Sequence, residues 1–220
     1  MPVKSQRRSR GRPRASGSDR EETRRLILDA ATALIAERGY HGTTVNEMIA
    51  RAGLSKGTFY WHFRSKEEVL LAVLEERVDG PIYELSKTLA NAPAARDMAP
   101  EASAQLLRVL ERGRETILLE REYELLAIRE PTLRARYRRR QAALRKALSA
   151  GLDARARQLG APPFSTPAAD VAAAYLTLGV GLAAEKLIDS EAVPDNLLGE
   201  MVALIYQGLV ARAERRATGV

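Results

Sequence analysis

The chain has 220 residues, of which 45% are apolar and none is cysteine. A buried core is therefore expected, while disulfides, thiol catalysis and cysteine metal sites are excluded. Residues 1–18 hold six basic side chains and no acidic one, which accounts for +6 of the net charge of +7. No apolar stretch follows them, and the longest nearly apolar run, residues 171–184, is shorter than the roughly 20 residues that a bilayer requires. We expect a soluble, cytoplasmic protein with no membrane contact.

Residues 1–18 are rich in Arg, Ser, Gly and Pro and lack hydrophobic periodicity, so they are expected to form a disordered basic arm. Within the arm, Arg10-Gly11-Arg12-Pro13 resembles the core of an AT-hook, a segment that places arginines in a narrow A·T minor groove. The alternative is a solvated arm that adds only non-specific affinity for phosphates. Both interpretations predict that Arg10 and Arg12 contact nucleic acid.

A short helix is predicted over residues 44–52. Thr44 is suited to cap it, Glu47 completes a capping box, and Gly53 lies where a left-handed residue ends a helix. Ile49 lies on its apolar face.

A second short helix, over residues 55–63, begins at Ser55, and a longer helix over 18–37, with Ser18 and Glu21 as a capping box, precedes both. Two short helices joined by a glycine-containing turn are the arrangement of a DNA-binding helix-turn-helix.

The helix over 55–63 has two different faces. At about 100° per residue, Phe59 and Phe63 lie together and are expected to be buried. Gly57, Thr58 and Trp61 lie opposite, where small and aromatic groups can meet base edges and thymine methyls in a major groove.

The side chains that flank this strip are suited to phosphates rather than to bases. Tyr60 and His62 can reach the groove walls, while Lys56 and Lys66 each stand at a helix N-terminus, which favours phosphate. The complete set of contacts predicted from this region is Thr44, Ser55, Lys56, Gly57, Thr58, Tyr60, Trp61, His62 and Lys66.

The stretch A-G-L-S-K-G-T-F-Y-W-H-F-R-S-K-E-E-V-L, residues 52–70, resembles the signature of the TetR family of bacterial transcriptional regulators. The resemblance is strong over about residues 22–75, and beyond them only the helical layout is similar. Ile49 is a departure, because the family more often has a small alanine there. The resemblance implies a homodimer that binds a palindromic DNA operator, most often as a repressor, and that a small-molecule effector releases.

The remaining residues are also predicted to be helical. A connecting helix should run from residue 65 to about 89, with a kink or break at Gly80-Pro81, followed by a loop over 91–100. Five more helices are expected over 100–113, 116–129, 132–159, 167–188 and 195–216. The fold class is therefore all-α with about nine helices, divided into a basic arm (1–18), a DNA-binding domain (19–65) and a ligand-binding and dimerisation domain (66–220).

Residues 111–130 are rich in glutamate, and residues 134–146 are rich in arginine. They can form solvated faces with ion pairs of small energy. The alternative is a site for an anionic effector near Arg134 or Arg138.

The last two predicted helices carry apolar stripes with small residues, which are typical of a four-helix dimer interface. The side chains predicted to form it are Ala172, Tyr175, Leu176, Gly179, Leu182, Ala183, Leu198, Met201, Ile205 and Leu209. The alternative is that both stripes face their own core.

The resemblance places an effector pocket between the connecting helix and the helices over 100–129, 132–159 and 167–188. Its candidate lining is apolar or carries a single phenol, which favours a lipophilic molecule: Leu74, Val78, Leu106, Leu110, Leu118, Tyr123, Leu126, Tyr137 and Leu178.

No catalytic residues, metal site or cofactor are predicted, since the two histidines lie in or beside the helix-turn-helix and no phosphate-binding or nucleophile motif is present. Two other classes stay open. One is an architectural or constitutive DNA-binding protein without an effector. The other is a basic protein that acts at a membrane or an acidic partner.

Overall fold

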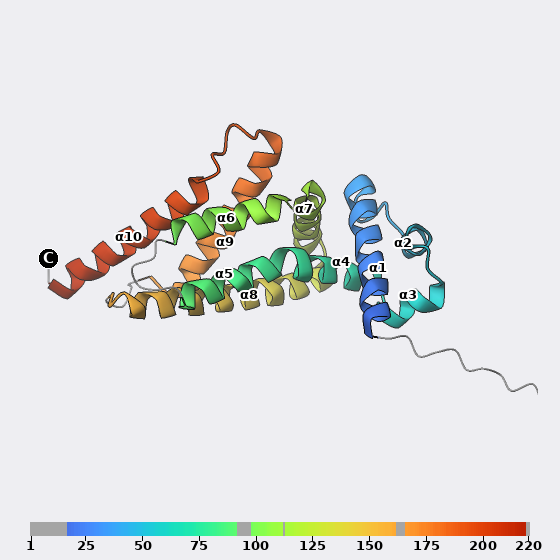
Figure 1. Cartoon of the computed structure of the whole chain (residues 1–220), viewed down its shortest axis with the longest axis horizontal. Helices are drawn as coiled ribbons and strands as arrows, with labels where there is room; N and C mark the ends of the chain where they lie inside the picture. The colour runs from blue at the N-terminus through green and yellow to red at the C-terminus, as the bar shows by residue number, and fades with distance from the viewer. Residues whose placement is uncertain (1–16, 92–97, 112, 162–165, 219–220) are drawn as a thin grey trace, which may run out of the picture.

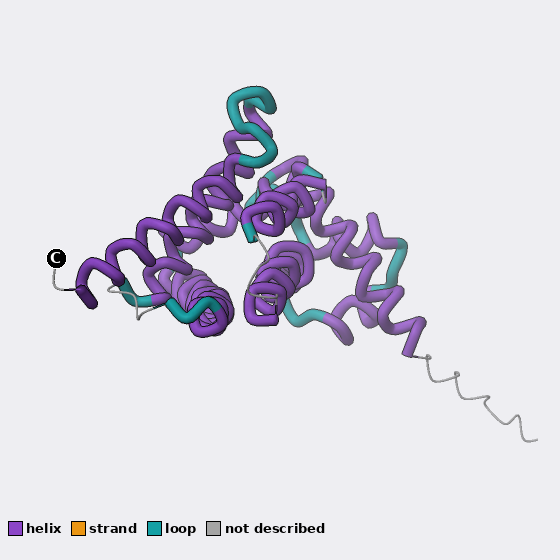
Figure 2. The backbone as a smooth tube through the Cα atoms, turned by 60° about the vertical axis from the view of Figure 1, so that its left-hand side comes forward, coloured by secondary structure: helices purple, strands orange, loops and turns teal. Residues whose placement is uncertain are grey.

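The computed structural model describes residues 17–91, 98–111, 113–161 and 166–218, so the predicted contacts Arg10 and Arg12 lie outside the described residues. Within these ranges the chain forms helices and loops without a strand, as Figure 2 shows. The helices are α1 (Gly17–Arg38), α2 (Val45–Ala52), α3 (Lys56–His62), α4 (Lys66–Leu74), α5 (Gly80–Asn91), α6 (Ala99–Glu111), α7 (Arg114–Arg129), α8 (Pro131–Gln158), α9 (Ala168–Ile188) and α10 (Leu197–Thr218), with a π-helical turn, η1 (Glu75–Asp79), between α4 and α5. Because α4, η1 and α5 follow one another directly, the described ranges hold nine helical rods, and the predicted all-α fold is confirmed.

Local side-chain chemistry sets the ends of the short helices. The Thr44 hydroxyl accepts from the Glu47 backbone N–H, and the Glu47 carboxylate accepts from the Thr44 N–H at 2.8 Å, so the predicted capping box is present. Ser55 caps α3 by accepting from the Thr58 N–H at 3.1 Å. Gly53 adopts φ +67°, a conformation that side chains rarely tolerate. The prediction that Ser18 caps α1 was wrong, because Ser18 lies within the helix, which includes Gly17.

The connecting helix passes through Gly80-Pro81 without a break, so of the two predicted outcomes, a kink or a break, the break was wrong. The Gly80 N–H donates to the Glu75 carbonyl, five residues back, which is the spacing of a π-helix. Pro81 has no N–H to place in the ladder. The π-helical turn immediately before the proline therefore lets α5 continue from α4.

The first hydrophobic cluster crosses the predicted domain boundary at residues 65 and 66. It contains the buried side chains of α1 to α4 and also Tyr123, Leu126 and Leu133 of α7 and α8. A polar contact follows the same route, because the Tyr40 N–H donates to Glu122 Oε1 at 2.8 Å. The unit formed by the first three helices thus packs against α7 and α8 as well as against α4.

The C-terminal helices enclose a second region at the other end of the molecule (Figure 1), where α5 packs on α8, α8 on α9, and α6 on α10. Two glycines permit these approaches. A Cβ on Gly151 would lie 2.7 Å from the Ser86 carbonyl, and one on Gly199 would lie closer still to the Ala99 carbonyl. Both would collide with backbone atoms, so α5–α8 and α6–α10 packing depends on glycine.

Helix α9 is longer than the apolar run counted in the sequence. It has 21 residues, and an 18-residue window within it has a mean hydropathy of 1.5, so by length and composition alone it could cross a membrane. The expectation that no segment is long enough is therefore corrected. In the structure one side of α9 packs against α8 and α10, which accounts for part of its apolar character.

Candidate DNA interface and ligand cavity

The two faces of α3 point as the periodicity predicts. Phe59 and Phe63 are buried, with exposed fractions of 0% and 4%, whereas Trp61 is 61% exposed and Tyr60 is 46% exposed. Lys56 and Gly57 are exposed as well. The outward face therefore presents one cation, one indole and one phenol, the groups that contact phosphates and bases in a groove.

The hydroxyls predicted to contact DNA already have partners within the protein. Thr44 and Ser55 are exposed caps, and Thr58, which is half-buried, has its Oγ1 2.7 Å from Ser55 Oγ. These groups hold α2 and α3 in place, and their contact with DNA stays a prediction.

Arg20 of α1, which sequence reasoning missed, completes the exposed aromatic face. Its guanidinium carbon lies 4.9 Å from the centroid of the Trp61 ring, and the Trp61 ring meets the His62 ring edge to face at 4.6 Å. Burial, assisted by the charge of Arg24, lowers the pKa of His62 below its ordinary value of 6.5. The imidazole is therefore uncharged at neutral pH and can offer a phosphate a hydrogen bond but not a charge.

Lys66 is also engaged within the protein, and its predicted contact with a DNA phosphate stays a prediction. Its Nζ donates to the Tyr40 carbonyl at 2.6 Å and to the Thr43 carbonyl at 2.8 Å, and it lies 4.0 Å from the centroid of the Tyr40 ring. Burial lowers the pKa of Lys66. Two of its three donors are thus used inside the protein, so Lys66 fastens the start of α4 to the turn between α1 and α2.

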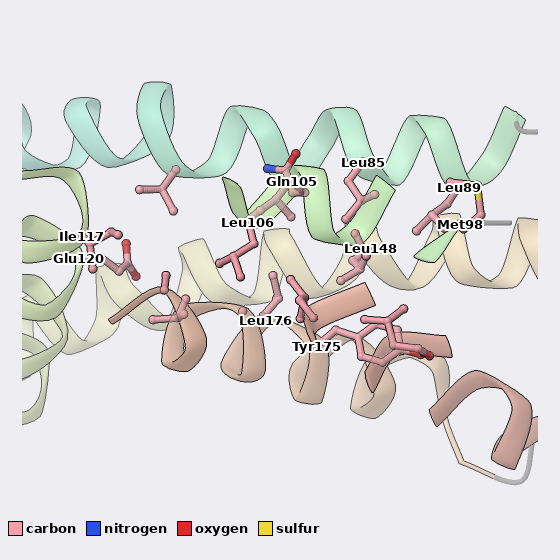
Figure 3. Close-up of a pocket in the computed structure, with 18 of the residues that line it drawn as sticks. Leu85, Leu89, Met98, Gln105, Leu106, Ile117, Glu120, Leu148, Tyr175 and Leu176 are labelled. Carbon is pink, nitrogen blue, oxygen red and sulfur yellow. The ribbon is translucent and has the colours of Figure 1, made fainter. Parts of the chain in front are cut away.

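A cavity of about 110 Å³ lies between the predicted helices, with α10 as an additional wall (Figure 3). Its lining is aliphatic except for Gln105, Thr116, Glu120 and Tyr175. Of the nine predicted lining residues, only Val78 and Leu106 line it.

The other seven predicted lining residues have different positions. Leu74, Tyr123 and Leu126 are buried in the first cluster, Leu110 and Leu178 pack beside Leu106 and Ile117, Tyr137 lines a smaller neighbouring cavity, and Leu118 is 37% exposed. Apolar periodicity marks all of these residues alike, because it does not distinguish a cavity wall from solid core.

Three buried charges join the cavity wall to the connecting helix. The Arg140 guanidinium donates to Asp79 through Nε at 2.9 Å and Nη2 at 2.5 Å, and to Glu120 Oε1 through Nη1 at 2.9 Å. The side chains are only 4–6% exposed. Burial raises the pKa of Asp79 although Arg140 opposes it. We call Asp79, Glu120 and Arg140 the buried charge triad; with all three ionised its net charge is −1.

The structure does not support an anion site at Arg134, because this side chain donates to the carbonyls of Ala127, at 3.1 Å, and Ile128, at the end of α7. It is a helix C-terminal cap, a position that favours a cation. Arg138 is exposed and does not line the cavity.

Most of the predicted dimer stripe faces the protein's own interior. Four of the ten residues are buried within the protomer, namely Ala172, Tyr175, Ala183 and Leu198. Leu176 and Gly179 line the cavity, Leu182 packs beside it, Met201 and Leu209 are half-buried, and Ile205 is exposed. The large apolar side chains exposed on α9 and α10 are Leu187, Ile188, Leu204 and Ile205, of which only Ile205 belongs to the predicted stripe.

The N-terminal part of the chain is similar to known proteins. Residues 27–73 fit the family model for bacterial regulatory proteins of the tetR family. Over 79 residues, 36% of this chain and 36% of the relative, the chain is 39% identical to the transcriptional activator FasR of Mycolicibacterium smegmatis. It is 32% identical over 71 residues, 32% of this chain and 37% of the relative, to a fatty acid metabolism regulator protein of Bacillus subtilis. The matches thus span little more than a third of these curated relatives.

The likeness to solved structures extends over most of the chain. SmeT, the repressor of the Stenotrophomonas maltophilia multidrug efflux pump SmeDEF, is 26% identical, with a TM-score of 0.55, over 81% of this chain and 85% of that one. Its complex with triclosan gives 25% identity and a TM-score of 0.61, over 84% and 91% of the two chains.

Fold and site together define a helix-turn-helix protein with a helical second unit that encloses a cavity. Residues 27–73 belong to the TetR family of bacterial regulatory proteins, whose members are DNA-binding regulators and not enzymes.

Proposed function

We propose that the protein is a ligand-responsive transcriptional repressor that binds a palindromic operator as a homodimer and is released by a lipophilic small molecule. Residues 19–65 would bind DNA, and residues 66–220 would bind the ligand and dimerise. The observation that carries this proposal is the pairing of an exposed Trp61–Lys56 face with a separate apolar cavity, joined by one continuous helix.

The π-helical turn is the part of that helix that contacts both the cavity and α1. Val78 lines the cavity, and the next residue, Asp79, belongs to the buried charge triad. On the other side of the turn, Glu76 pairs with Arg24 of α1 at 2.5 Å, and Arg77 pairs with Asp29 of α1.

A ligand that moves the turn therefore also moves α1 and α4. If it binds better to a form whose two recognition helices no longer fit successive major grooves, about 34–36 Å apart, operator occupancy falls by population shift. A coupling free energy of about 1–3 kcal/mol is sufficient for changes of roughly 5- to 150-fold.

The solved relatives support the ligand and the direction of regulation. SmeT is described as a repressor and was solved as a triclosan complex. We infer repression for this chain, although FasR is described as an activator, because the likeness to SmeT covers 81–84% of the chain and that to FasR only 36%.

Selection of bound sequences from a random DNA pool tests the DNA-binding function. We expect an enriched palindrome whose half-sites are separated by about one helical turn or a multiple of it, and an affinity for it that falls with salt less steeply than the affinity for unrelated DNA. No enriched sequence, with binding lost altogether at high salt, would contradict the proposal and favour non-specific binding through the basic arm.

Dimerisation is predicted to use the exposed apolar side chains of α9 and α10. Leu204 is 58% exposed, so Leu204→Glu should leave the helical content of the protomer unchanged while converting the dimer to a monomer, because a buried unpaired charge at an interface is costly. Light scattering coupled to gel filtration measures the mass. Leu26→Glu, at an exposed leucine of α1, is the matched control and should remain dimeric. A dimeric Leu204→Glu variant would exclude this face.

A further inference from the structure

The cavity contains a buried hydrogen-bond donor without a partner. Gln105 of α6 lines the cavity and is 5% exposed, and its Nε2 has no hydrogen-bond partner. Figure 3 shows Glu120 beside Ile117 at one end of the lining residues, Leu89 and Met98 at the other, and Gln105 between them.

Arg108 determines which end of the Gln105 amide accepts. Its Nε and Nη2 lie 3.3 Å and 3.0 Å from Gln105 Oε1. A guanidinium can only donate, so the atom that faces it must be the amide oxygen. The amide nitrogen is therefore the end left without a partner. Leaving a buried donor unsatisfied is costly, and such groups in native proteins call for an explanation.

The charges around the cavity disfavour an anionic ligand. Among the residues that the structure describes, no lysine or arginine lines the cavity, and the one charged residue that lines it is Glu120. Arg140, which contacts Glu120, is shared between Glu120 and Asp79, so these three groups carry a net negative charge. Arg108 does not line the cavity and donates to the Gln105 oxygen. A carboxylate or phosphate would lose its hydration and gain no cationic partner.

The cavity also disfavours a cationic ligand. Within the described part of the chain, its one charged partner in the cavity would be Glu120. Glu120 Oε1 accepts from Arg140 at 2.9 Å, and its Oε2 lies 2.8 Å from the same guanidinium. The cation would have to compete with that contact and lose its own hydration.

We propose that the cavity binds an uncharged, largely apolar molecule whose single oxygen acceptor, of the carbonyl or ether type, takes the hydrogen bond offered by Gln105 Nε2. This inference rests on the proposed ligand-responsive function and names the chemical class of the ligand. The aliphatic walls supply the contact with the apolar body, and Gln105 supplies its orientation.

Four probes of nearly equal shape test the inference: acetophenone, ethylbenzene, benzoate and benzylamine. Their dissociation constants are measured on the full-length protein by titration calorimetry or NMR. Acetophenone should bind about tenfold more tightly than ethylbenzene, which has no acceptor, because it pairs a buried donor. It should exceed benzoate and benzylamine by at least as much.

Gln105→Leu keeps the size of the side chain and removes the donor. In this variant the preference for acetophenone over ethylbenzene should disappear, while ethylbenzene binds as before and the melting temperature does not fall. Gln158→Leu, outside the cavity, should keep the preference. Gln105→Glu, which has the same shape, should weaken acetophenone below ethylbenzene.

Tighter binding of benzoate, an undiminished preference in Gln105→Leu, or no binding of any probe would each overturn the inference. Operator binding measured on the same samples separates it from the proposed function. If the protein prefers acetophenone but enriches no DNA sequence, the inference about the ligand class stands and the proposed regulatory function fails. If the protein binds its operator but none of the probes, the regulatory function stands and the inference about the ligand class fails.

Discussion

Replacing Arg140 with methionine is expected to lower the free energy of unfolding by about 3–5 kcal/mol, because Asp79 and Glu120 would stay buried without their cation. The Arg140 side chain is 5% exposed and forms an ion pair with each of the two carboxylates. Chemical denaturation of the variant and the native protein measures the difference.

The loss of unfolding free energy in Arg140→Met should depend on pH, because the pKa of Asp79 differs between the folded and unfolded states. Burial holds the pKa of Asp79 in the folded protein above its ordinary value of 3.8, even against the opposing charge of Arg140. A carboxyl whose pKa is raised by folding stabilises the folded state at low pH, and this stabilisation is lost as pH rises through the folded pKa. Without Arg140 the pKa of Asp79 rises further, so the variant should be closer to the native protein at about pH 5 than at about pH 8.

Two further variants control this result. Arg139→Met removes a cation from the exposed neighbouring position and should change stability by less than about 0.5 kcal/mol. Combining Arg140→Met with Asp79→Asn and Glu120→Gln removes all three charges and should recover most of the loss, since a buried ion pair replaced as a whole is often nearly neutral. Equal losses in Arg139→Met and Arg140→Met would contradict a buried triad.

Replacing Trp61 with alanine is expected to weaken operator binding by roughly 5- to 150-fold, the range of about 1–3 kcal/mol for a specific base contact. Melting should change little, because Trp61 is 61% exposed and the main protein contact it loses is the stacking of Arg20, worth about 0.5–1 kcal/mol at an exposed site. Fluorescence anisotropy with the selected operator and with unrelated DNA measures both affinities. Only the operator affinity should fall.

Lys56→Ala is the companion variant with the opposite signature. It should weaken binding to the operator and to unrelated DNA alike and reduce the salt slope by about one, because a phosphate contact releases a counterion without reading sequence. Lys87→Ala, which removes an exposed lysine of α5, should leave both properties unchanged. Normal binding by both Trp61→Ala and Lys56→Ala would show that α3 is not the recognition helix.

The ends of the short helices and the direction of α3 could be predicted from the sequence because they depend on neighbours in the chain. The Thr44–Glu47 capping box, the Ser55 cap and the left-handed Gly53 each involve groups within three residues of one another. The burial of Phe59 follows from the helical period alone. The family resemblance over residues 52–70 is likewise carried by one continuous stretch of sequence, so it could be recognised without the structure.

Tertiary structure decided the features that depend on distant residues. The sequence marks Lys66 as a cation at a helix start, but only the packed turn at Tyr40 and Thr43 shows that two of its donors are taken. Arg140 lies in a run of arginines that all look alike, and it differs because the fold places two buried carboxylates against it.

The cavity and the outward faces of α9 and α10 show the same limit. These helices are apolar on several sides, so periodicity cannot tell which side lines the cavity, which joins the core and which is exposed. Tyr175 proved to face inward and Leu204 outward. By itself the sequence determined where the helices are and what α3 can touch, because local bonds carry that information. The position of the cavity, its unsatisfied Gln105 donor and the buried charge triad required the fold, because each is made by residues from different helices.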